Sequence, residues 1–408
     1  MGFGTPSAGV WLLVGIAAMS VGYVAGCFLA VVVRHLRVRS PVPLSTPAVS
    51  ILTPLCGEEP GLEQNLRTLC QSATADVQIV WGVRDAEDAA LPIAHRVLAD
   101  FPRVDAEVIV GCAPLGLNAK VNTLARLAAA ARHDVVVIAD SDTRFAPGDL
   151  ARLVDTLRDP TVGIASCLFR SRPSTSRWSR FAGLNVDEWY LPSVLLSRAL
   201  GSEAYCSGPV MALRRDVLER IGGIAPLATF LADDYELGAR VRRLGLHSVI
   251  ADCEVAVTVE EPSGARLLSH ELRWMRTIRA ITPVGHACLA LTYAVPLTTL
   301  TVLATGASAG SLIMLGLAVA TRAALHAVVS RAPGHADPRH ASWWLVPLRD
   351  FWSAAVWVLS YTGRTVTWRG RKLWVGWDGV LYADGQRPPR LGILGRRIRE
   401  IRSLRGST

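Results

Sequence analysis

Two long stretches without charged side chains constrain most strongly what this chain can fold into. Residues 2–33 contain none, and between residues 280 and 321 the only side chain that can become charged near neutral pH is that of His286. Either stretch is long enough to cross the roughly 30 Å of hydrocarbon in a bilayer as a helix. Residues 40–279, in contrast, have the charge content of a globular domain. This pattern excludes a disordered or fibrous chain and a purely soluble enzyme, and it argues against a transporter with many spans.

The first stretch predicts an uncleaved N-terminal membrane anchor at residues 10–33. A signal peptide would carry basic residues before its apolar run, whereas Arg34 and Arg37 follow the run here. Residues 24–27 imitate a lipoprotein cleavage box, but the apolar run continues beyond them, so lipidation is the weaker interpretation. Because basic residues favour the cytoplasmic side, we expect the N-terminus outside the cell.

The second stretch is too long for one span, and residues 304–310 within it are typical of a turn, so we expect two spans. Residues 342–361 are also apolar, but they include Arg349 and Asp350, which are costly in lipid unless they pair or face protein. A third crossing would also leave the arginine-rich tail outside. We therefore expect a re-entrant or interfacial element there, with its tryptophans near the lipid headgroups.

The net charge of +9 is concentrated beside the apolar stretches, where it favours the cytoplasmic face and anionic lipid. No basic stripe with interleaved aromatic residues runs through the globular part, so no nucleic-acid partner is expected. The eight cysteines are scattered without a Cys-x-x-Cys pair, which favours reduced thiols over disulfides or a zinc site.

Between the apolar stretches, short apolar runs alternate with helical segments. This predicts an α/β domain with a parallel sheet, whose ligands bind at the carboxyl ends of the strands. The run at residues 135–139 is unbroken, so this strand should be buried on both faces. The expected strands are 48–54, 77–83, 106–110 and 135–139, and the expected helices are 61–71, 89–101 and 118–132.

Asp140 and Asp142 lie directly after the buried strand, separated by Ser141. Two carboxylates at this spacing in a turn can face one ligand, and hard oxygen donors suit Mg²⁺ or Mn²⁺ shared with a diphosphate. The alternative is a simple turn at the end of a strand, where Asp and Ser are common.

A second pair of acids, Asp233 and Asp234, begins a predicted helix that runs to about Arg243. Adjacent acids repel each other, so one of them can have a raised pKa suited to a general base. Helix capping is the alternative interpretation.

Five further positions could bind a substrate. His270, Arg273 and Trp274 are spaced i, i+3, i+4, so a helix places them on one face, where Arg can clamp a phosphate and Trp can cover a sugar. The alternative is a basic segment that precedes a membrane span. Asp85, after the second strand, is placed for a nucleoside, and Lys120, at a helix start, for a phosphate. Either of these two could instead be a surface charge.

The order of these motifs resembles that of the membrane-bound inverting glycosyltransferases with one nucleotide-diphosphosugar-binding domain. The chain is similar to the ceramide glucosyltransferase family (glycosyltransferase family 21), and within it to the bacterial glycosyltransferases associated with hopanoid biosynthesis. The resemblance covers nearly the whole chain and rests on the sequences TPLCG, VRDAED, NAKVN, DSD, LADDYELG, HELRWMRTIR and WRGR.

The resemblance implies a Rossmann-like α/β domain of the GT-A type, inserted between membrane helices. It also implies roles for the candidates. Asp85 would hold the uridine, Asp140 and Asp142 the metal and the diphosphate, and Asp234 would deprotonate the acceptor hydroxyl. Arg273 and Trp274 would close over the diphosphate and the acceptor. The remaining candidates for substrate binding are Lys120, Asp233 and His270.

The implied enzyme is a metal-dependent, multi-pass protein of the inner membrane with a cytoplasmic catalytic domain. It would transfer a sugar from a UDP-sugar to a lipid hydroxyl, either N-acetylglucosamine to a hopanoid polyol or glucose to ceramide. Related polysaccharide synthases carry Gln where this chain has His270, which argues against the main alternative, a processive polysaccharide synthase of glycosyltransferase family 2. A non-catalytic membrane scaffold is another alternative, and it would need neither nucleotide nor metal.

The sequence thus predicts four parts. They are an anchor at 1–39, a glycosyltransferase domain at 40–279, a membrane region at 280–362 and a basic cytoplasmic tail at 363–408.

Overall fold

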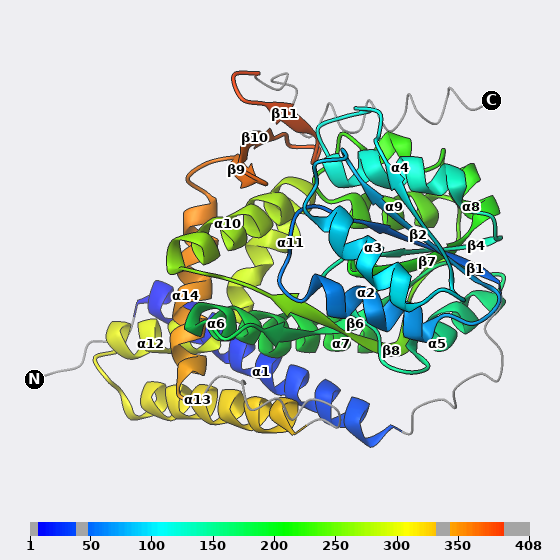
Figure 1. The fold of residues 1–408 in the computed structure, drawn as a ribbon. Coiled ribbons are helices and arrows are strands. Elements are labelled where there is room, and N and C mark those ends of the chain that lie inside the picture. The colour runs from blue at the N-terminus through cyan, green and yellow to red at the C-terminus, as the bar shows by residue number, and fades with distance from the viewer. Residues whose placement is uncertain (1–6, 38–47, 332–342, 387–408) are drawn as a thin grey trace, which may run out of the picture. The chain divides into compact units, whose positions relative to one another are not determined.

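The computed structural model describes residues 7–37, 48–331 and 343–386 (Figure 1). Within the chain there are two compact units. Of the described residues, 48–174 and 201–260 form the sheet unit, and 7–37, 175–200, 261–331 and 343–386 form the helical unit. The four-part division predicted above follows membrane association rather than compactness, and it stays a prediction.

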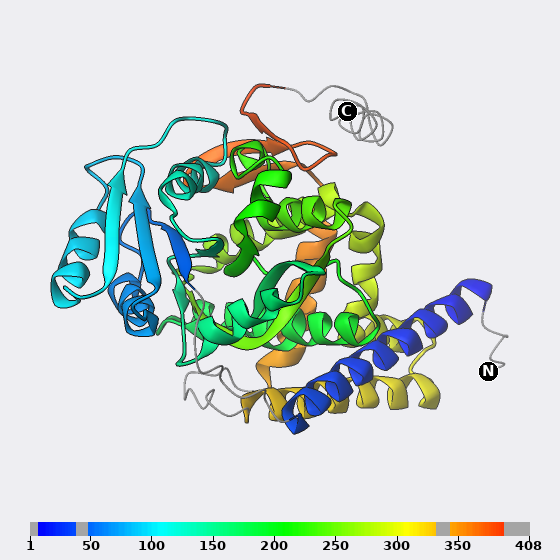
Figure 2. The same ribbon diagram turned by 90° about the vertical axis from the view of Figure 1, so that its right-hand side faces the viewer.

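The sheet unit is built on an eight-stranded sheet in the order β3-β2-β1-β4-β7-β6-β8-β5 (Figure 2). Strands β1 to β4 pair in parallel, whereas β7 runs antiparallel to both of its neighbours, β4 and β6. The start of β7 therefore lies beside the carboxyl end of β4. The strands are β1 Val49–Pro54, β2 Val77–Val83, β3 Asp105–Val110, β4 Val135–Ala139, β5 Thr143–Arg144, β6 Val162–Pro173, β7 Val210–Arg214 and β8 His247–Val259.

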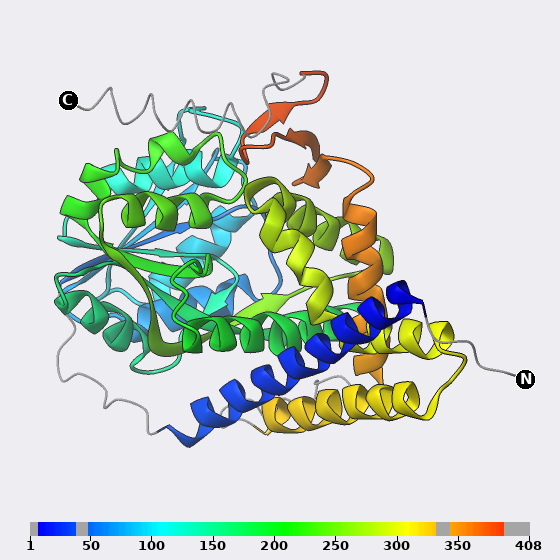
Figure 3. The same cartoon turned by 180° about the vertical axis from the view of Figure 1, so that it is seen from behind.

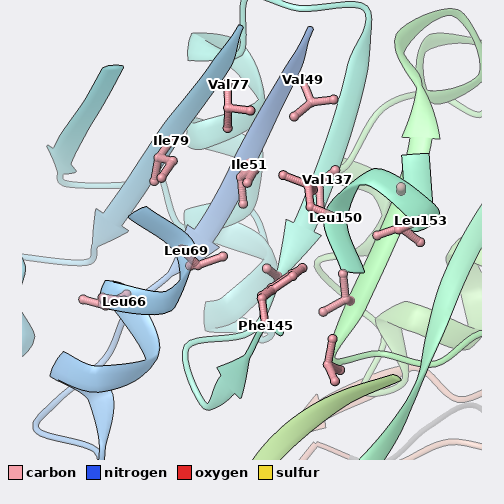
Figure 4. Packing of buried hydrophobic residues seen from close by; sticks show 14 of the residues in the cluster. Val49, Ile51, Leu66, Leu69, Val77, Ile79, Val137, Phe145, Leu150 and Leu153 are labelled. Atoms are coloured by element: carbon pink, nitrogen blue, oxygen red, sulfur yellow. The ribbon is translucent and has the colours of Figure 1, made fainter. Parts of the chain in front are cut away.

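Helices cover both faces of this sheet. On one face, Leu66 and Leu69 pack with Ile51 and Val137 of the sheet in one hydrophobic cluster (Figure 4). On the other face, a second cluster includes Ile138. The first face is covered by α2 (Leu62–Ser72), α3 (Ala90–Asp100) and α5 (Asp149–Asp155), and the second by α4 (Ala119–Ala130), α8 (Arg215–Arg220) and α9 (Asp233–Arg243). Short 3-10 turns, Thr156–Arg158 and Ala225–Leu227, complete the unit.

The α/β class predicted from the sequence is confirmed, and each expected strand and helix is present within about two residues of its predicted bounds. Strand β4 is buried on both faces as expected, because Val137 and Ile138 enter opposite clusters. Helix α4 begins where it does because the side chain of Asn118 accepts a hydrogen bond from the backbone N–H of Val121 at 3.1 Å.

The helical unit contains the apolar stretches. Helix α1 lies alongside α13 (Figure 3). A small sheet in the order β11-β10-β9 follows α14. The elements are α1 Ala8–Leu36, α6 Arg177–Asn185, a π-helical turn Val186–Tyr190, α7 Leu191–Ala199, α10 Gly264–Ile281, α11 Pro283–Cys288, a 3-10 turn Leu289–Thr292, α12 Ala294–Ala304, α13 Ala309–Ser330, α14 Leu345–Ser360, β9 Thr365–Trp368, β10 Arg371–Val375 and β11 Leu381–Ala383.

Helices α1 and α13 are each long and apolar enough to cross a membrane. The segment Pro283–Thr292 and α12 meet the same test together, but they are bent by 68° at the break between them. The turn expected at residues 304–310 is present, because α12 ends at Ala304 and α13 begins at Ala309. The second apolar helix, α13, runs to Ser330, beyond the charge-free stretch that ends at Thr321.

Helix α13 continues past Thr321 although the next residue, Arg322, is charged, because this charge is paired within the protein. The guanidinium of Arg322 donates to both carboxylate oxygens of Asp350 at 2.9 and 3.1 Å, and to the carbonyl oxygen of Glu188 at 2.8 Å. Arg322 and Asp350 are both buried. A paired and hydrogen-bonded charge no longer requires water, so the helix need not end there.

The two charges in α14 that argued against a third crossing are both paired. Asp350 pairs with Arg322, and Arg349 donates to Glu271 of α10 at 2.5 Å. Trp352 also donates to Glu271, at 2.7 Å. The cost of these charges therefore no longer decides whether α14 crosses the bilayer, and the re-entrant or interfacial element stays a prediction. Residue 342 and the basic tail from residue 387 onward lie outside the described residues.

We expect Arg322→Met to destabilise the chain strongly, because it leaves the Asp350 carboxylate buried without its partner. Loss of one member of a buried pair typically costs about 3–5 kcal/mol. The double variant R322M/D350L should recover much of this loss. Thermal and denaturant unfolding in detergent micelles measures both changes. Arg331→Met, which removes an exposed arginine from the end of the same helix, is the matched control. Equal stability of R322M and R331M would show that the pair contributes nothing.

Candidate active site

The site is assembled where β4 ends and β7 begins. Asp140 follows the last residue of β4, and its backbone N–H donates to the carbonyl oxygen of Pro209 at 2.9 Å. Because β7 runs antiparallel to β4, the segment before β7 meets the loop after β4. The carboxyl end of a strand next to such a change of direction is where open α/β sheets bind ligands.

Lys120 connects two of the predicted acids. Its Nζ lies 2.6 Å from Oδ1 of Asp140 and 3.6 Å from Oδ2 of Asp233. Burial lowers the pKa of Lys120, but the carboxylates of Asp140 and Asp233 outweigh it, so the pKa of Lys120 is raised and the ammonium group stays charged. The ammonium group of Lys120 thereby holds together the start of α4, the loop after β4 and the start of α9.

Asn118 was not predicted as a site residue, although it belongs to the NAKVN motif. Besides capping α4, its side-chain amide donates to the carbonyl oxygen of Phe230 at 2.8 Å and to Oδ1 of Asp233 at 3.4 Å. Its backbone N–H donates to the carbonyl oxygen of Ala228 at 2.8 Å. One residue thus fixes both the start of α4 and the loop that leads into α9. An Asn at the start of a helix predicts an N-cap. Nothing in the sequence alone predicts its contacts with the loop that leads into α9.

Among the residues that the structure describes, none forms an ion pair with Asp142 like that of Lys120 with Asp140. Burial raises the pKa of Asp142 to about 8, and the negative charges of Asp140 and Glu59 act in the same direction. Glu59 was not predicted either. It accepts a hydrogen bond from the hydroxyl of Ser141 at 2.6 Å, which brings the loop after β1 to the loop after β4. The acids at this edge of the sheet therefore exceed the positive charge that Lys120 supplies.

This excess of partly buried carboxylates fits a divalent metal. Among residues 7–37, 48–331 and 343–386, no group of three or more His, Cys, Asp or Glu side chains is arranged to hold a metal ion. Mg²⁺, however, usually takes only one or two protein carboxylates and completes its shell with water and substrate phosphates. Asp140 and Asp142 meet that requirement, so the predicted metal dependence stays a prediction that the donor set supports.

The carboxylate of Asp234 lies in space that is open because residue 208 is a glycine. A Cβ atom added to Gly208 would lie 2.7 Å from Oδ2 of Asp234, so residue 208 admits no side chain without displacing this carboxylate. Oδ1 of Asp234 accepts a hydrogen bond from the backbone N–H of Tyr235 at 2.7 Å. Burial raises the pKa of Asp234 to about 6, and the charge of Asp233 adds to the effect. Such a pKa suits a group that must take up a proton near neutral pH.

Asp85 is placed differently from the other acids. It follows β2 at the same edge of the sheet, but its side chain is 46% exposed and pairs with Arg84 at 3.0 Å. Its neighbour Asp88 accepts hydrogen bonds from the backbone N–H groups of Gly57 and Ala90, at 2.7 and 3.0 Å, and so joins the loops after β1 and β2. The predicted contact of Asp85 with a nucleoside stays a prediction.

His270, Arg273 and Trp274 belong to α10 of the helical unit. The helix predicted for them is present, and the rings of His270 and Trp274 lie 4.4 Å apart. Nδ1 of His270 lies 2.6 Å from Oε1 of Glu261, a buried residue that was not predicted. The roles expected for His270, Arg273 and Trp274 on a substrate stay predictions.

Two arginines further along α10 are not free basic residues before a membrane span. Arg276 donates to the carbonyl oxygen of Thr365 at 2.5 Å, and Arg279 donates to that of Gly363. Arg276 therefore attaches the first residue of β9 to α10, and Arg279 attaches the segment before β9. The alternative interpretation, in which this helix is only a basic segment before a membrane span, therefore does not hold for Arg276 and Arg279.

The family model described as glycosyl transferase family 21 matches residues 12–381. The chain belongs to glycosyl transferase family 21. The predicted family is thereby confirmed. Sugar transfer and the GT-A type of the α/β domain stay proposals.

Among curated proteins, the chain is similar to ceramide glucosyltransferase 1 of Caenorhabditis elegans, with 23% identity over 50% of this chain and 44% of that protein. It is also similar to the ceramide glucosyltransferase of Komagataella phaffii, with 31% identity over 29% of this chain and 24% of that protein. The chain spans about half the length, or less, of the curated relatives that it matches.

Among solved structures, the chain is similar to a mannosyltransferase from Pyrobaculum calidifontis in complex with GDP-Man and Mn²⁺. The TM-score is 0.45 and the identity 19%, over 85% of this chain and 99% of that chain. A second similar structure is GalNAc-T7 with UDP, GalNAc and Mn²⁺, with a TM-score of 0.40 and 13% identity over 59% of this chain and 49% of that chain.

We expect Lys120→Met to weaken the site, because Asp140 and Asp233 lose the cation that connects them. Binding of UDP should weaken at least tenfold, since a buried carboxylate without its partner changes position or protonation. Isothermal titration of the full chain in detergent with UDP and Mn²⁺ measures this affinity. Arg126→Met removes an exposed cation from the same helix and is the control. Unchanged affinity in Lys120→Met would mean that Lys120 has no part in the site.

Proposed function

We propose that this chain is a membrane-bound inverting glycosyltransferase that moves a sugar from a UDP-sugar to a hydroxyl group of a membrane lipid. The observation that carries the proposal is the position of Asp234. Its carboxylate has a raised pKa and lies against Gly208, next in sequence to the Asp233 that Lys120 connects to Asp140. A candidate base thus lies in the same part of the sheet unit as the candidate diphosphate site.

Asp234 would act as the general base. As the lipid hydroxyl attacks the anomeric carbon, its proton passes to Oδ2 of Asp234, while the bond from the anomeric carbon to the diphosphate oxygen breaks. Attack from the face opposite to the leaving group inverts the anomeric configuration. A carboxylate whose pKa is raised by burial accepts such a proton more readily than one in water.

Charge on the leaving diphosphate would be stabilised by cations. Asp140 and Asp142 would hold a divalent metal, which supplies Lewis-acid stabilisation of the diphosphate when it is bound. Arg273 is proposed for the diphosphate as well, because a planar guanidinium can donate to two oxygens at once. Asp85 is proposed for the uridine, and Trp274 for the acceptor.

The acceptor and the donor are proposed as two pairs, ceramide with UDP-glucose and a hopanoid polyol with UDP-N-acetylglucosamine. The curated relatives are named ceramide glucosyltransferases, which supports the first pair. The likeness of LADDYELG and HELRWMRTIRA to hopanoid-associated enzymes supports the second. Both acceptors are bulky apolar bodies with a hydroxyl, so an active site at the cytoplasmic face of the inner membrane can reach either without removing it from the bilayer.

We expect Asp234→Asn to lower turnover by about 10²–10⁴-fold, because the amide keeps the size of the side chain but cannot accept the proton. UDP-sugar binding should remain. Sugar transfer to ceramide and to bacteriohopane polyols, followed by mass spectrometry of the lipid product, measures turnover. Asp216→Asn changes an exposed acid in the same unit and is the control. Near-normal turnover of D234N would identify Asp234 as a helix cap, and polymer formed in place of glycolipid would point to a polysaccharide synthase.

The metal gives a separate test. EDTA should abolish transfer, and Mg²⁺ or Mn²⁺ should restore it. Asp142→Ala should weaken the binding of UDP and of the metal together, because both depend on the same carboxylates. Titration of the chain with Mn²⁺, followed by its paramagnetic resonance signal, detects metal binding without any assay of activity. Full activity in EDTA would leave Asp140 and Asp142 as a turn after β4.

A further inference from the structure

His270 is the first residue of the motif in which related polysaccharide synthases carry Gln, and here it has a dedicated partner. Nδ1 of His270 lies 2.6 Å from Oε1 of Glu261. An ionised carboxylate can only accept a hydrogen bond, so the proton of this contact belongs to Nδ1 of the imidazole. In the neutral ring, Nε2 then carries a lone pair and can only accept.

Glu261 is fixed independently of this contact. Its backbone N–H donates to the hydroxyl of Ser179 at 2.7 Å, and its carbonyl oxygen accepts from the hydroxyl of Ser176 at 2.8 Å. Both serines lie at the start of α6, in the same unit as Glu261 and His270. The side chain of Glu261 is only 6% exposed, whereas that of His270 is 38% exposed. A rigid, buried acid therefore directs a ring that remains accessible.

An apolar surface lies beside this ring. Trp274 is 37% exposed, and its ring centre lies 4.4 Å from that of His270. A lone pair on a partly exposed ring beside an indole matches an alcohol carried on an apolar body. It does not match an anion, because a lone pair on Nε2 repels phosphate oxygens.

We propose that Glu261 is a positioning residue that holds His270 with its proton on Nδ1, so that Nε2 accepts a hydrogen bond from a hydroxyl group of the lipid acceptor. The identity of the ligand rests on the function proposed above. The orientation of the ring does not, and it can be tested without any substrate.

The first test reads the tautomer directly. In the full chain with ¹⁵N-labelled histidine in detergent, the two ring nitrogens of His270 have different chemical shifts, and His270→Gln identifies them by their loss. We expect the Nδ1–H form in the parent chain and a mixture of tautomers in Glu261→Gln, because an amide can either donate or accept. Glu260→Gln changes an exposed acid next in sequence and should leave the signals unchanged. An Nε2–H form or an imidazolium in the parent chain would overturn the proposal.

The second test is a double-mutant cycle on sugar transfer. Glu261→Gln should lower kcat/KM for the lipid by about tenfold, as the loss of an orienting partner commonly does, with KM for the UDP-sugar unchanged. In the His270→Gln background the same substitution should change kcat/KM less than about twofold, because the ring that Glu261 orients is gone. If Glu261 acted only on the stability of α6 and α10, its effect would persist in that background, and the proposal would be wrong.

The two tests also separate this proposal from the proposed function. If no lipid accepts a sugar from the parent chain but the Nδ1–H tautomer is present and depends on Glu261, the function fails while the positioning role stands. If glycolipid forms and the cycle shows no coupling between residues 261 and 270, the function stands and the positioning role fails.

Discussion

The candidate site depends on one partly buried ammonium group. Lys120 lies between Asp140 and Asp233, which come from the loop after β4 and the start of α9. Without a cation, the two carboxylates, which are largely removed from water, would repel each other across a medium that screens charge poorly. The position of Lys120 in turn depends on Asn118, which begins α4 and also holds the loop before α9. The cap that Asn118 forms, the ion pairs of Lys120 and the proximity of Asp140 to Asp233 therefore depend on one another.

The same arrangement leaves the acids unequal, which is what a reaction with a base and a metal requires. Burial raises the pKa of Asp140, of Asp142 and of Asp234. The ammonium group of Lys120 lies 2.6 Å from Asp140 and offsets this effect most directly there. Environment rather than residue type thus divides these carboxylates into candidates for binding and for proton transfer. Gly208 completes the division, because only a residue without a side chain leaves room for the Asp234 carboxylate.

The sequence predicts much of this and misses the rest for identifiable reasons. Strand β4 and the acids after it are visible because an unbroken apolar run followed by Asp-Ser-Asp is local information. Glu59 and Glu261 are not visible, because each lies in a loop where an acid is ordinary and gains its meaning from a partner distant in sequence. Ser141 lies 82 residues from Glu59. Gly208 is missed because its role comes from the absence of a Cβ atom, which would collide with the Asp234 carboxylate.

Hydropathy alone leaves the helical unit open in a similar way. The charge-free stretch ends at Thr321, and Arg349 and Asp350 argue against a third crossing only if they neither pair nor face protein. In the structure, Arg322 and Asp350 neutralise each other across 28 positions, and Arg349 is neutralised by Glu271. Removing two charges from water costs free energy, but the attraction and the hydrogen bonds between the partners offset much of it. The net cost of burying a pair is therefore lower than that of burying the two charges separately. Two charges within apolar segments are therefore better read as a prediction that those segments contact each other than as a boundary of either one.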